Sequence, residues 1–205
     1  MTEKRFKKGF TLMELLVTIG IMAVVVTLTV PAFVGLGRGS KMNSALSNLK
    51  NTCSLARQWA ISHRDDVYII FPIGGTSAED EPVKKLNSYG VYSASQGKFI
   101  KEWTYLPEGV ILDDEKTKWG SFRASPTRNV PGLSNPQLKA IAYNQEGSLK
   151  SGASTKSIYF IEGTIDRETN EPIKTFGQDD RFDAVKVNGL TGLPYIERDI
   201  KITGS

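Results

Sequence analysis

The stretch KKGFTLMELLVTIGIMAVVVTLTVPAF, residues 7–33, decides how this chain is organised. After two lysines and a glycine it is almost wholly apolar, and Glu14 is the one ionisable residue within the apolar run. At 1.5 Å per residue, a helix of about 25 residues reaches about 37 Å, enough to cross the hydrocarbon core of a bilayer. An ionisable group inside such a segment costs roughly 2.5–3.5 kcal/mol, so we expect Glu14 to have a function.

The flanking charge predicts the orientation of this segment. Four basic residues and one acidic residue precede Gly9, so about +3 of the net charge of +4 lies in the first nine residues. A basic flank marks the cytoplasmic side of a membrane segment. A secretory signal peptide fits less well, because its apolar region is usually about 7–15 residues long and this longer run is interrupted by a carboxylate. A plain single-pass membrane anchor is the other alternative.

These residues resemble the N-terminus of type IV prepilins and of the pseudopilins of type II secretion. In that class a short basic leader ends in a glycine, here Gly9, and a membrane-bound prepilin peptidase cuts after it. The same enzyme methylates the new N-terminal residue, here Phe10. The fifth mature residue is a glutamate, here Glu14, and a proline near the twenty-second position corresponds to Pro31. The resemblance implies a leader at residues 1–9, a prepilin peptidase as processing partner and other filament subunits as assembly partners.

A physical role for Glu14 follows from cleavage after Gly9. Cleavage creates an amine on Phe10, four residues ahead of Glu14, and positions i and i+4 share one face of a helix. A carboxylate near a helix N-terminus also meets the positive end of the helix macrodipole. An amine from the same subunit, or from a neighbour in a filament, would offset part of the desolvation of Glu14. We therefore predict that Glu14 sets the register of the subunit in a polymer.

The helical pattern continues beyond the apolar segment. Small and apolar residues recur at steps of three and four, and they predict one buried stripe. The stripe consists of Met42, Ala45, Leu46, Leu49, Cys53, Ala56, Trp59 and Ala60. Cys53 lies on this stripe, so we interpret it as a core residue rather than a reactive thiol.

The pattern predicts one helix from about Phe10 to about His63. Its membrane half is expected at residues 10–36 and its amphipathic half at residues 37–63. Pro31 removes a backbone hydrogen bond, so with the glycines that follow it predicts a kink within residues 30–39. His63 is interpreted as a residue at the helix end rather than as a ligand.

Residues 64–205 change to short strand-like runs between turn residues. Runs such as VYIIF at 67–71 are rich in β-branched and aromatic side chains, and the Gln96-Gly97 and Asn188-Gly189 pairs are hairpin signals. About seven to nine strands follow one helix. The predicted fold class is therefore α+β, with a long N-terminal helix packed on an antiparallel β-sheet domain.

This region resembles the GspH/FimT family of minor pseudopilins and minor pilins. The resemblance is carried by LARQWAISHRDDVYIIF at 55–71, WTYLPEGVIL at 103–112, AYNQEGSLKSGASTKSIYF at 142–160 and VKVNGLTGLPY at 185–195. It implies a pilin-like fold with a periplasmic β-rich domain at residues 64–205. The segments at 76–85, 125–136 and 166–180 depart from the family pattern.

The composition offers little material for catalysis. One cysteine and one histidine exclude an intrachain disulfide and leave no set for a Cys/His metal cluster or a Ser–His–Asp triad. Acidic clusters at residues 113–115 and 179–183 are candidates for calcium, but neither has EF-hand spacing, and solvated loop charge is the favoured interpretation. We predict a protein that is not an enzyme and has no cofactor, no metal and no small-molecule substrate.

One functional hypothesis leads. The protein is expected to be a minor pseudopilin in the bacterial inner membrane, with a cytoplasmic N-terminus and a periplasmic C-terminal domain, that joins or primes the pseudopilus of a type II secretion system. The alternative is a minor type IV pilin of the FimT kind, which acts in pilus biogenesis or in DNA uptake. DNA binding is less favoured, because the mature chain is close to neutral. The candidate residues for it are Lys84, Lys85, Lys150, Arg198 and Lys201.

Overall fold

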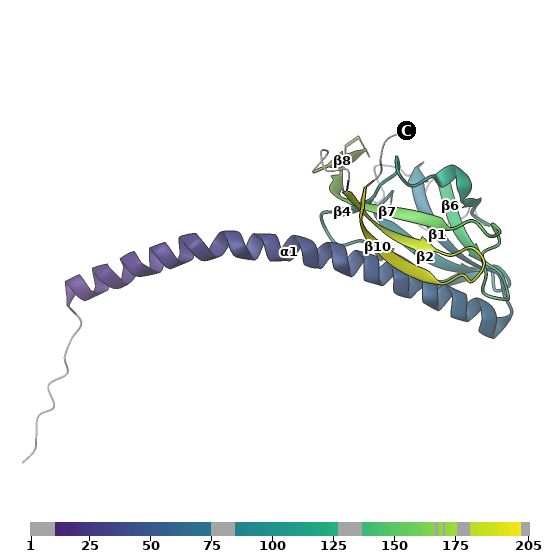
Figure 1. Ribbon diagram of the computed structural model, residues 1–205, viewed down its shortest axis with the longest axis horizontal. Helices are drawn as coiled ribbons and strands as arrows, with labels where there is room; N and C mark the ends of the chain where they lie inside the picture. The colour runs from purple at the N-terminus through teal and green to yellow at the C-terminus, as the bar shows by residue number, and fades with distance from the viewer. Residues whose placement is uncertain are drawn as a thin grey trace, which may run out of the picture. The chain divides into compact units, whose positions relative to one another are not determined.

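The computed structural model describes residues 11–74, 85–126, 137–166, 168–169, 171–175 and 181–201 (Figure 1). The chain divides into two compact units, residues 1–40 and 41–205. One helix, α1 (Leu12–His63), belongs to both units. The second unit also contains η1 (Trp119–Ser121) and the strands β1 (Val67–Gly74), β2 (Ser88–Ser93), β3 (Lys98–Tyr105), β4 (Val110–Leu112), β5 (Arg123–Ala124), β6 (Gln137–Tyr143), β7 (Lys156–Ile165), β8 (Pro172–Lys174), β9 (Arg181–Val187) and β10 (Pro194–Lys201).

The long helix expected from the sequence is present. The backbone is helical throughout α1, Pro31 included, so the kink expected within residues 30–39 stays a prediction. None of the helical residues that the structure describes forms a segment with both the length and the hydropathy of a membrane span.

The C-terminal end of α1 is capped by a residue in a left-handed conformation. Arg64 adopts a left-handed conformation with φ of 48°, and the N–H of Asp65 donates a hydrogen bond to the carbonyl oxygen of Ala60 at 3.1 Å. This is the geometry of a Schellman-type helix end, here with arginine in the position that usually holds glycine. His63 is the last residue of α1, and its ring stacks on Trp59 at a centroid distance of 3.9 Å. The prediction that His63 ends the helix is confirmed.

The strands form two antiparallel sheets. The first has the order β3-β2-β1-β6-β5; the second has the order β10-β9-β7-β4, and β8 pairs with β7. Both predicted hairpins are present, β2–β3 through Gly97 and β9–β10 through Asn188-Gly189. The second loop spans residues 188–193, so it is longer than the two-residue turn that an Asn-Gly pair favours. Further hydrogen bonds organise this longer loop.

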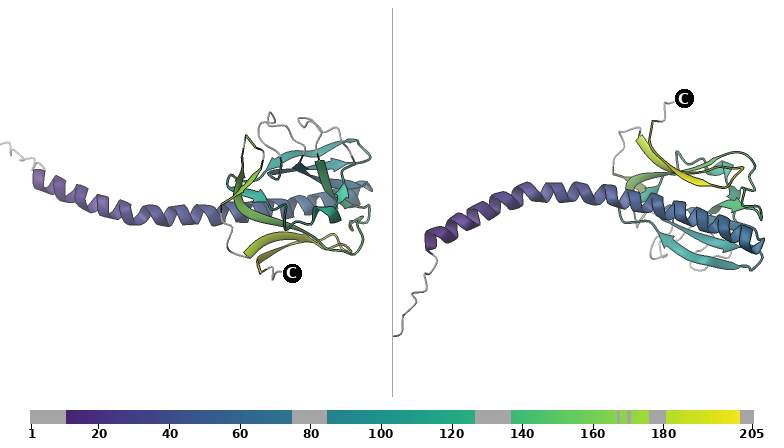
Figure 2. Two further views of the ribbon diagram at one scale, coloured as in Figure 1. Left: turned by 90° about the horizontal axis from the view of Figure 1, so that it is seen from above. Right: turned by 60° about the horizontal axis from the view of Figure 1, so that its bottom comes forward.

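The predicted helical stripe forms one side of the core. Ala45, Leu46, Leu49, Cys53, Ala56 and Ala60 are completely buried, and Met42 and Trp59 pack against them. The two sheets lie on either side of the second half of α1 (Figure 2), so the stripe can contact both. The α+β fold class, with a helix packed on antiparallel strands, is therefore confirmed.

Asp65 joins the helix end to the β2–β3 hairpin. Its carboxylate accepts hydrogen bonds from the hydroxyl of Ser93 and, at 3.0 Å, from the N–H of Ser95. Asp65 is only 4% exposed. Burial alone would raise the pKa of this carboxyl, but the hydrogen bonds outweigh burial and hold the pKa below its usual value.

We expect the Asp65→Asn variant to lose about 1–3 kcal/mol of stability at neutral pH. The folded pKa of Asp65 lies below its unfolded pKa. Its contribution is therefore present above the unfolded pKa and is lost as the pH falls through the folded pKa. Thermal unfolding from neutral to acidic pH should show the difference between wild type and Asp65→Asn shrinking in acid. A difference that stays constant with pH would contradict this role.

Candidate functional site

The candidate site is built on the first turn of α1. The N–H and the hydroxyl of Thr11 each donate to Oε2 of Glu14 at 3.1 Å, and the N–H of Glu14 donates to the hydroxyl oxygen of Thr11 at 3.2 Å. This reciprocal pairing is a capping box, in which Thr11 caps the helix and Glu14 occupies the third helical position. The T-x-x-E spacing is its sequence signal, and the sequence-based interpretation of Glu14 did not use it.

The capping box gives Glu14 a partner inside its own chain. Its carboxylate is turned back toward the N-terminal end of α1, which is where cleavage after Gly9 would create an amine. Gly9 and Phe10 lie outside the described residues, so the cleavage site, the methylation site and the contact between the amine and Glu14 stay predictions.

The large apolar side chains of the first turns of α1 are exposed. Their exposed fractions lie between 50% and 87%. They are Leu12, Met13, Leu15, Leu16, Val17, Ile19, Ile21, Met22, Val24, Val25 and Val26. Contiguous apolar surface of this extent marks a contact with lipid or with another protein.

Cys53 has no reactive character. It is completely buried, and burial raises the pKa of its thiol to about 12. A thiol that remains protonated at neutral pH is a poor nucleophile and a poor metal ligand. The interpretation of Cys53 as a core residue is confirmed.

Two carboxylates of the acidic cluster at residues 113–115 pair with one lysine. Lys174 Nζ lies 2.8 Å from Oε2 of Glu115 and 3.7 Å from Oδ1 of Asp113. The N–H groups of Glu115 and Lys116 also donate to Oδ1 of Asp113. In the described part of the chain no group of three metal-ligating side chains is found. Asp179 and Asp180, from the second candidate cluster, lie outside the described residues.

Two of the lysines considered for DNA binding are paired with carboxylates. Lys150 Nζ lies 2.5 Å from Oδ2 of Asp66, and Lys85 Nζ lies 3.3 Å from Oε1 of Glu171. Lys84 lies outside the described residues, and the side chain of Lys201 is not described. An ion pair within the protein competes with a phosphate for the same ammonium group, so these contacts do not strengthen the DNA-binding alternative.

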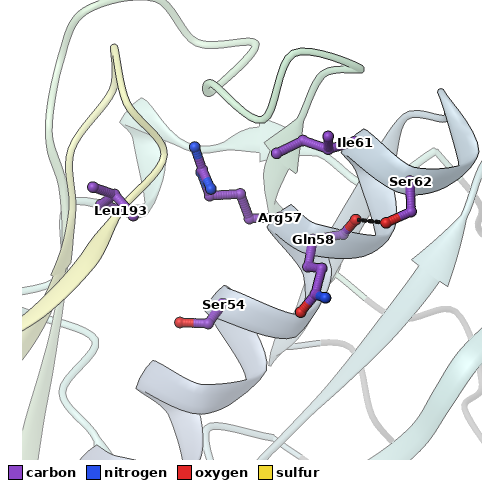
Figure 3. A pocket seen from close by; sticks show the side chains of 6 residues that line it. All are labelled: Ser54, Arg57, Gln58, Ile61, Ser62 and Leu193. Carbon is purple, nitrogen blue, oxygen red and sulfur yellow. Dashed lines mark hydrogen bonds between the residues drawn. The ribbon is translucent and has the colours of Figure 1, made fainter.

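A shallow pocket of about 280 Å³ lies where α1 meets the β9–β10 loop (Figure 3). It is lined by Ser54, Arg57, Gln58, Ile61, Ser62 and Leu193. Nε of Arg57 donates a hydrogen bond to the carbonyl oxygen of Thr191 at 2.8 Å, so this side chain fastens the loop to the helix. The lining residues include no carboxylate, histidine or thiol, and the two serines therefore have no general base beside them in the pocket.

Two turns interlock beside this pocket. The side-chain oxygen of Asn188 accepts from the N–H groups of Leu190 and Thr191, both at 3.0 Å. The loop shaped in this way brings Gly192 against the carbonyl oxygen of Gly147, so close that a Cβ on Gly192 would lie 1.8 Å from it. The Asn188-Gly189 pair predicts one of these turns, but their contact joins residues 45 positions apart and has no local signal.

Comparison with known proteins identifies the N-terminal motif. Residues 4–30 match the family model described as the prokaryotic N-terminal methylation motif. A comparison with curated proteins finds no match. Two crystal forms of the type IV minor pilin FimU from Pseudomonas aeruginosa PAO1 are similar in structure. Each has 10% identity and a TM-score of 0.43, and the matches cover 80% and 77% of this chain and 92% and 93% of FimU.

The motif match confirms the type IV prepilin-like N-terminus that the sequence predicts. The matched range contains Gly9 and Phe10, where cleavage is predicted, and Glu14. The N-terminal segment is thus of the prepilin type, which is the mark of a structural subunit rather than an enzyme.

Proposed function

We propose that the protein is a minor subunit of a type IV pilus-like filament. A prepilin peptidase cuts it after Gly9 and methylates Phe10. Before assembly, residues 10–36 hold it in the bacterial inner membrane, with the N-terminus in the cytoplasm and residues 64–205 in the periplasm. Its work is mechanical: it packs its N-terminal helix among those of other subunits and presents its β-rich domain on the filament.

The exposed apolar surface at the start of α1 is the observation that carries this proposal. Eleven large apolar side chains between Leu12 and Val26 are at least half exposed. Lipid can cover this surface before assembly, and the helices of neighbouring subunits can cover it afterwards. Glu14 at the edge of the surface supplies the polar contact that such an apolar helix otherwise lacks, because hydrophobic packing alone sets no axial position.

Processing by a prepilin peptidase is directly testable. We expect the full chain, expressed with an active prepilin peptidase, to lose residues 1–9 and to gain one methyl group on Phe10. Intact-mass measurement of the purified protein, with and without the peptidase, reads both changes at once. The Gly9→Ser variant, in which the residue before the cut is altered, provides a matched control and should keep its leader. An unchanged mass for the wild-type chain in the presence of active peptidase would refute the proposal.

The pseudopilus of type II secretion is the filament that the sequence resemblance favours. In that case a deletion strain should retain secreted proteins in its periplasm and keep its surface pili. Loss of surface pili with normal secretion would instead assign the protein to a type IV pilus. Both phenotypes are read in the same strain, and complementation with the wild-type gene checks that each belongs to this protein.

A further inference from the structure

Among the described strands, β8 pairs with β7 alone, whereas β7 also pairs with β4 and β9 in the second sheet. β8 pairs with β7 at three positions, from Gly163↔Lys174 to Ile165↔Pro172. Within the turn, Oδ1 of Asp166 accepts hydrogen bonds from the N–H groups of Glu168 and Thr169. The carbonyl oxygen of Ile173 lies over Gly163, so close that a Cβ there would be 2.6 Å from it. β8 therefore lies flat against the end of β7.

Side-chain charges tie this hairpin to other parts of the second unit. Lys174, the last residue of β8, reaches the loop that follows β4 and pairs there with Asp113 and Glu115. Glu171, just before β8, pairs with Lys85, which lies ahead of β2 in the first sheet. Through these ion pairs the hairpin contacts both the loop that follows β4 in the second sheet and the segment that precedes β2 in the first sheet.

The two sets of ion pairs differ in how much each is expected to contribute to the stability of the hairpin. Glu171 is 68% exposed, so solvent screens its ion pair with Lys85 and this pair contributes little to stability. Asp113 is only 2% exposed, and its hydrogen bonds come from the N–H groups of Glu115 and Lys116, which carry no net charge. The ammonium of Lys174, 3.7 Å away, is therefore the charge that offsets the burial of this carboxylate, and its removal should cost more than the loss of the pair at Glu171. Lys116 does not replace Lys174, because its ammonium lies over the ring of Phe182, 5.3 Å from the centroid.

We propose that the β7–β8 hairpin is a strap across one end of the two sheets, and that the ammonium of Lys174 on Asp113 and Glu115 is the latch that keeps it closed. The latch is a cation supplied by the chain itself, in the acidic loop where the sequence raised the question of calcium. The strap closes without a metal ion, and it opens locally, with the rest of the second unit still folded, when the charge of Lys174 is removed.

Hydrogen–deuterium exchange of the full chain in detergent tests the strap. In the Lys174→Met variant, peptides that cover residues 163–175 should exchange at least about tenfold faster than in the wild type. The Lys85→Met variant removes the exposed pair of the same hairpin and should change exchange there by less than about twofold. Lys174→Arg keeps the charge and should behave as the wild type. Peptides from residues 41–63 should keep wild-type protection in all three variants.

Several outcomes would overturn the proposal. One is wild-type exchange of residues 163–175 in Lys174→Met; another is equal acceleration in Lys85→Met. Faster exchange of residues 41–63 in Lys174→Met would show that Lys174 supports the whole unit rather than a strap. Failure of Lys174→Met to fold would show the same. Protection of residues 163–175 in the wild type that appears only with millimolar calcium chloride would assign the latch to a metal ion.

Discussion

Replacing Gly192 with alanine is expected to destabilise the second unit by at least about 4 kcal/mol, enough to leave much of the protein unfolded or aggregated. Gly192 has φ of 66°, which an L side chain rarely adopts. A Cβ at this position would lie 1.8 Å from the carbonyl oxygen of Gly147 and 3.1 Å from the ring of Tyr143. The backbone itself must therefore move.

The turn that Gly192 meets has little freedom to retreat. The carbonyl oxygen belongs to Gly147, whose own φ is 80°, and a Cβ on that residue would lie 2.6 Å from Cδ1 of Ile61 on α1. The hydrogen bond from Arg57 to Thr191 holds the other turn on the same helix. The two turns are thus pressed together against α1, and space for a methyl group at Gly192 requires both to shift.

Gly152→Ala is the matched control. Gly152 also has a positive φ, 82°, but a Cβ there would meet nothing within 4 Å. This variant should be destabilised only by the cost of placing a side chain in a left-handed conformation, about 1–2 kcal/mol. Urea unfolding of both variants and the wild type, in one detergent, gives the comparison. Equal losses of unfolding free energy for Gly192→Ala and Gly152→Ala would show that backbone conformation, and not the contact with Gly147, requires glycine at position 192.

The Glu14→Leu substitution is expected to reduce incorporation into filaments at least about tenfold. Each incoming helix is apolar over its first turns, and a one-residue slip moves it by only about 1.5 Å along the axis while rotating it by about 100°. A single carboxylate that meets a single N-terminal amine selects one of these positions. Insertion into the membrane should be retained or improved, because the intramembrane charge is gone. Cleavage after Gly9 should also persist, since the scissile bond lies outside the apolar run.

Because Glu14 also belongs to the capping box, the Glu14→Leu experiment must separate an assembly defect from a loss of helix. Loss of the cap costs about 0.5–2 kcal/mol of helix stability, which is too little to unfold a helix of 52 residues. Circular dichroism of Glu14→Leu should therefore match the wild type, so that an assembly defect cannot be assigned to a melted helix. Thr18→Leu is the control, because within the described part of the helix the Thr18 hydroxyl donates to the carbonyl oxygen of Leu15 and not to Glu14. The measurement is co-purification with partner subunits from membranes, and wild-type recovery of Glu14→Leu would remove the registering role.

The elements that the sequence predicts well are those with a local signal. The stripe from Met42 to Ala60 repeats at helical spacing, and the prepilin-like motif keeps its parts in one register, so both are readable from neighbouring residues alone. The Asn188-Gly189 pair likewise predicts a hairpin. β8 is missed because Pro172–Lys174 is only three residues long and lies in a polar, proline-containing segment without strand periodicity.

By itself, the sequence determined the type of N-terminus and the class of fold: a basic flank, an apolar helix with one glutamate, and an amphipathic continuation that packs on β-strands. Those properties depend on residue type and short spacing. Only the tertiary structure decided which distant groups meet: Arg57 with Thr191, Lys174 with Asp113, and Gly192 with Gly147. Their partners lie 134, 61 and 45 positions away in the chain. No periodicity or turn signal encodes such a pairing, because it exists only after the sheets and the helix have packed around a common core.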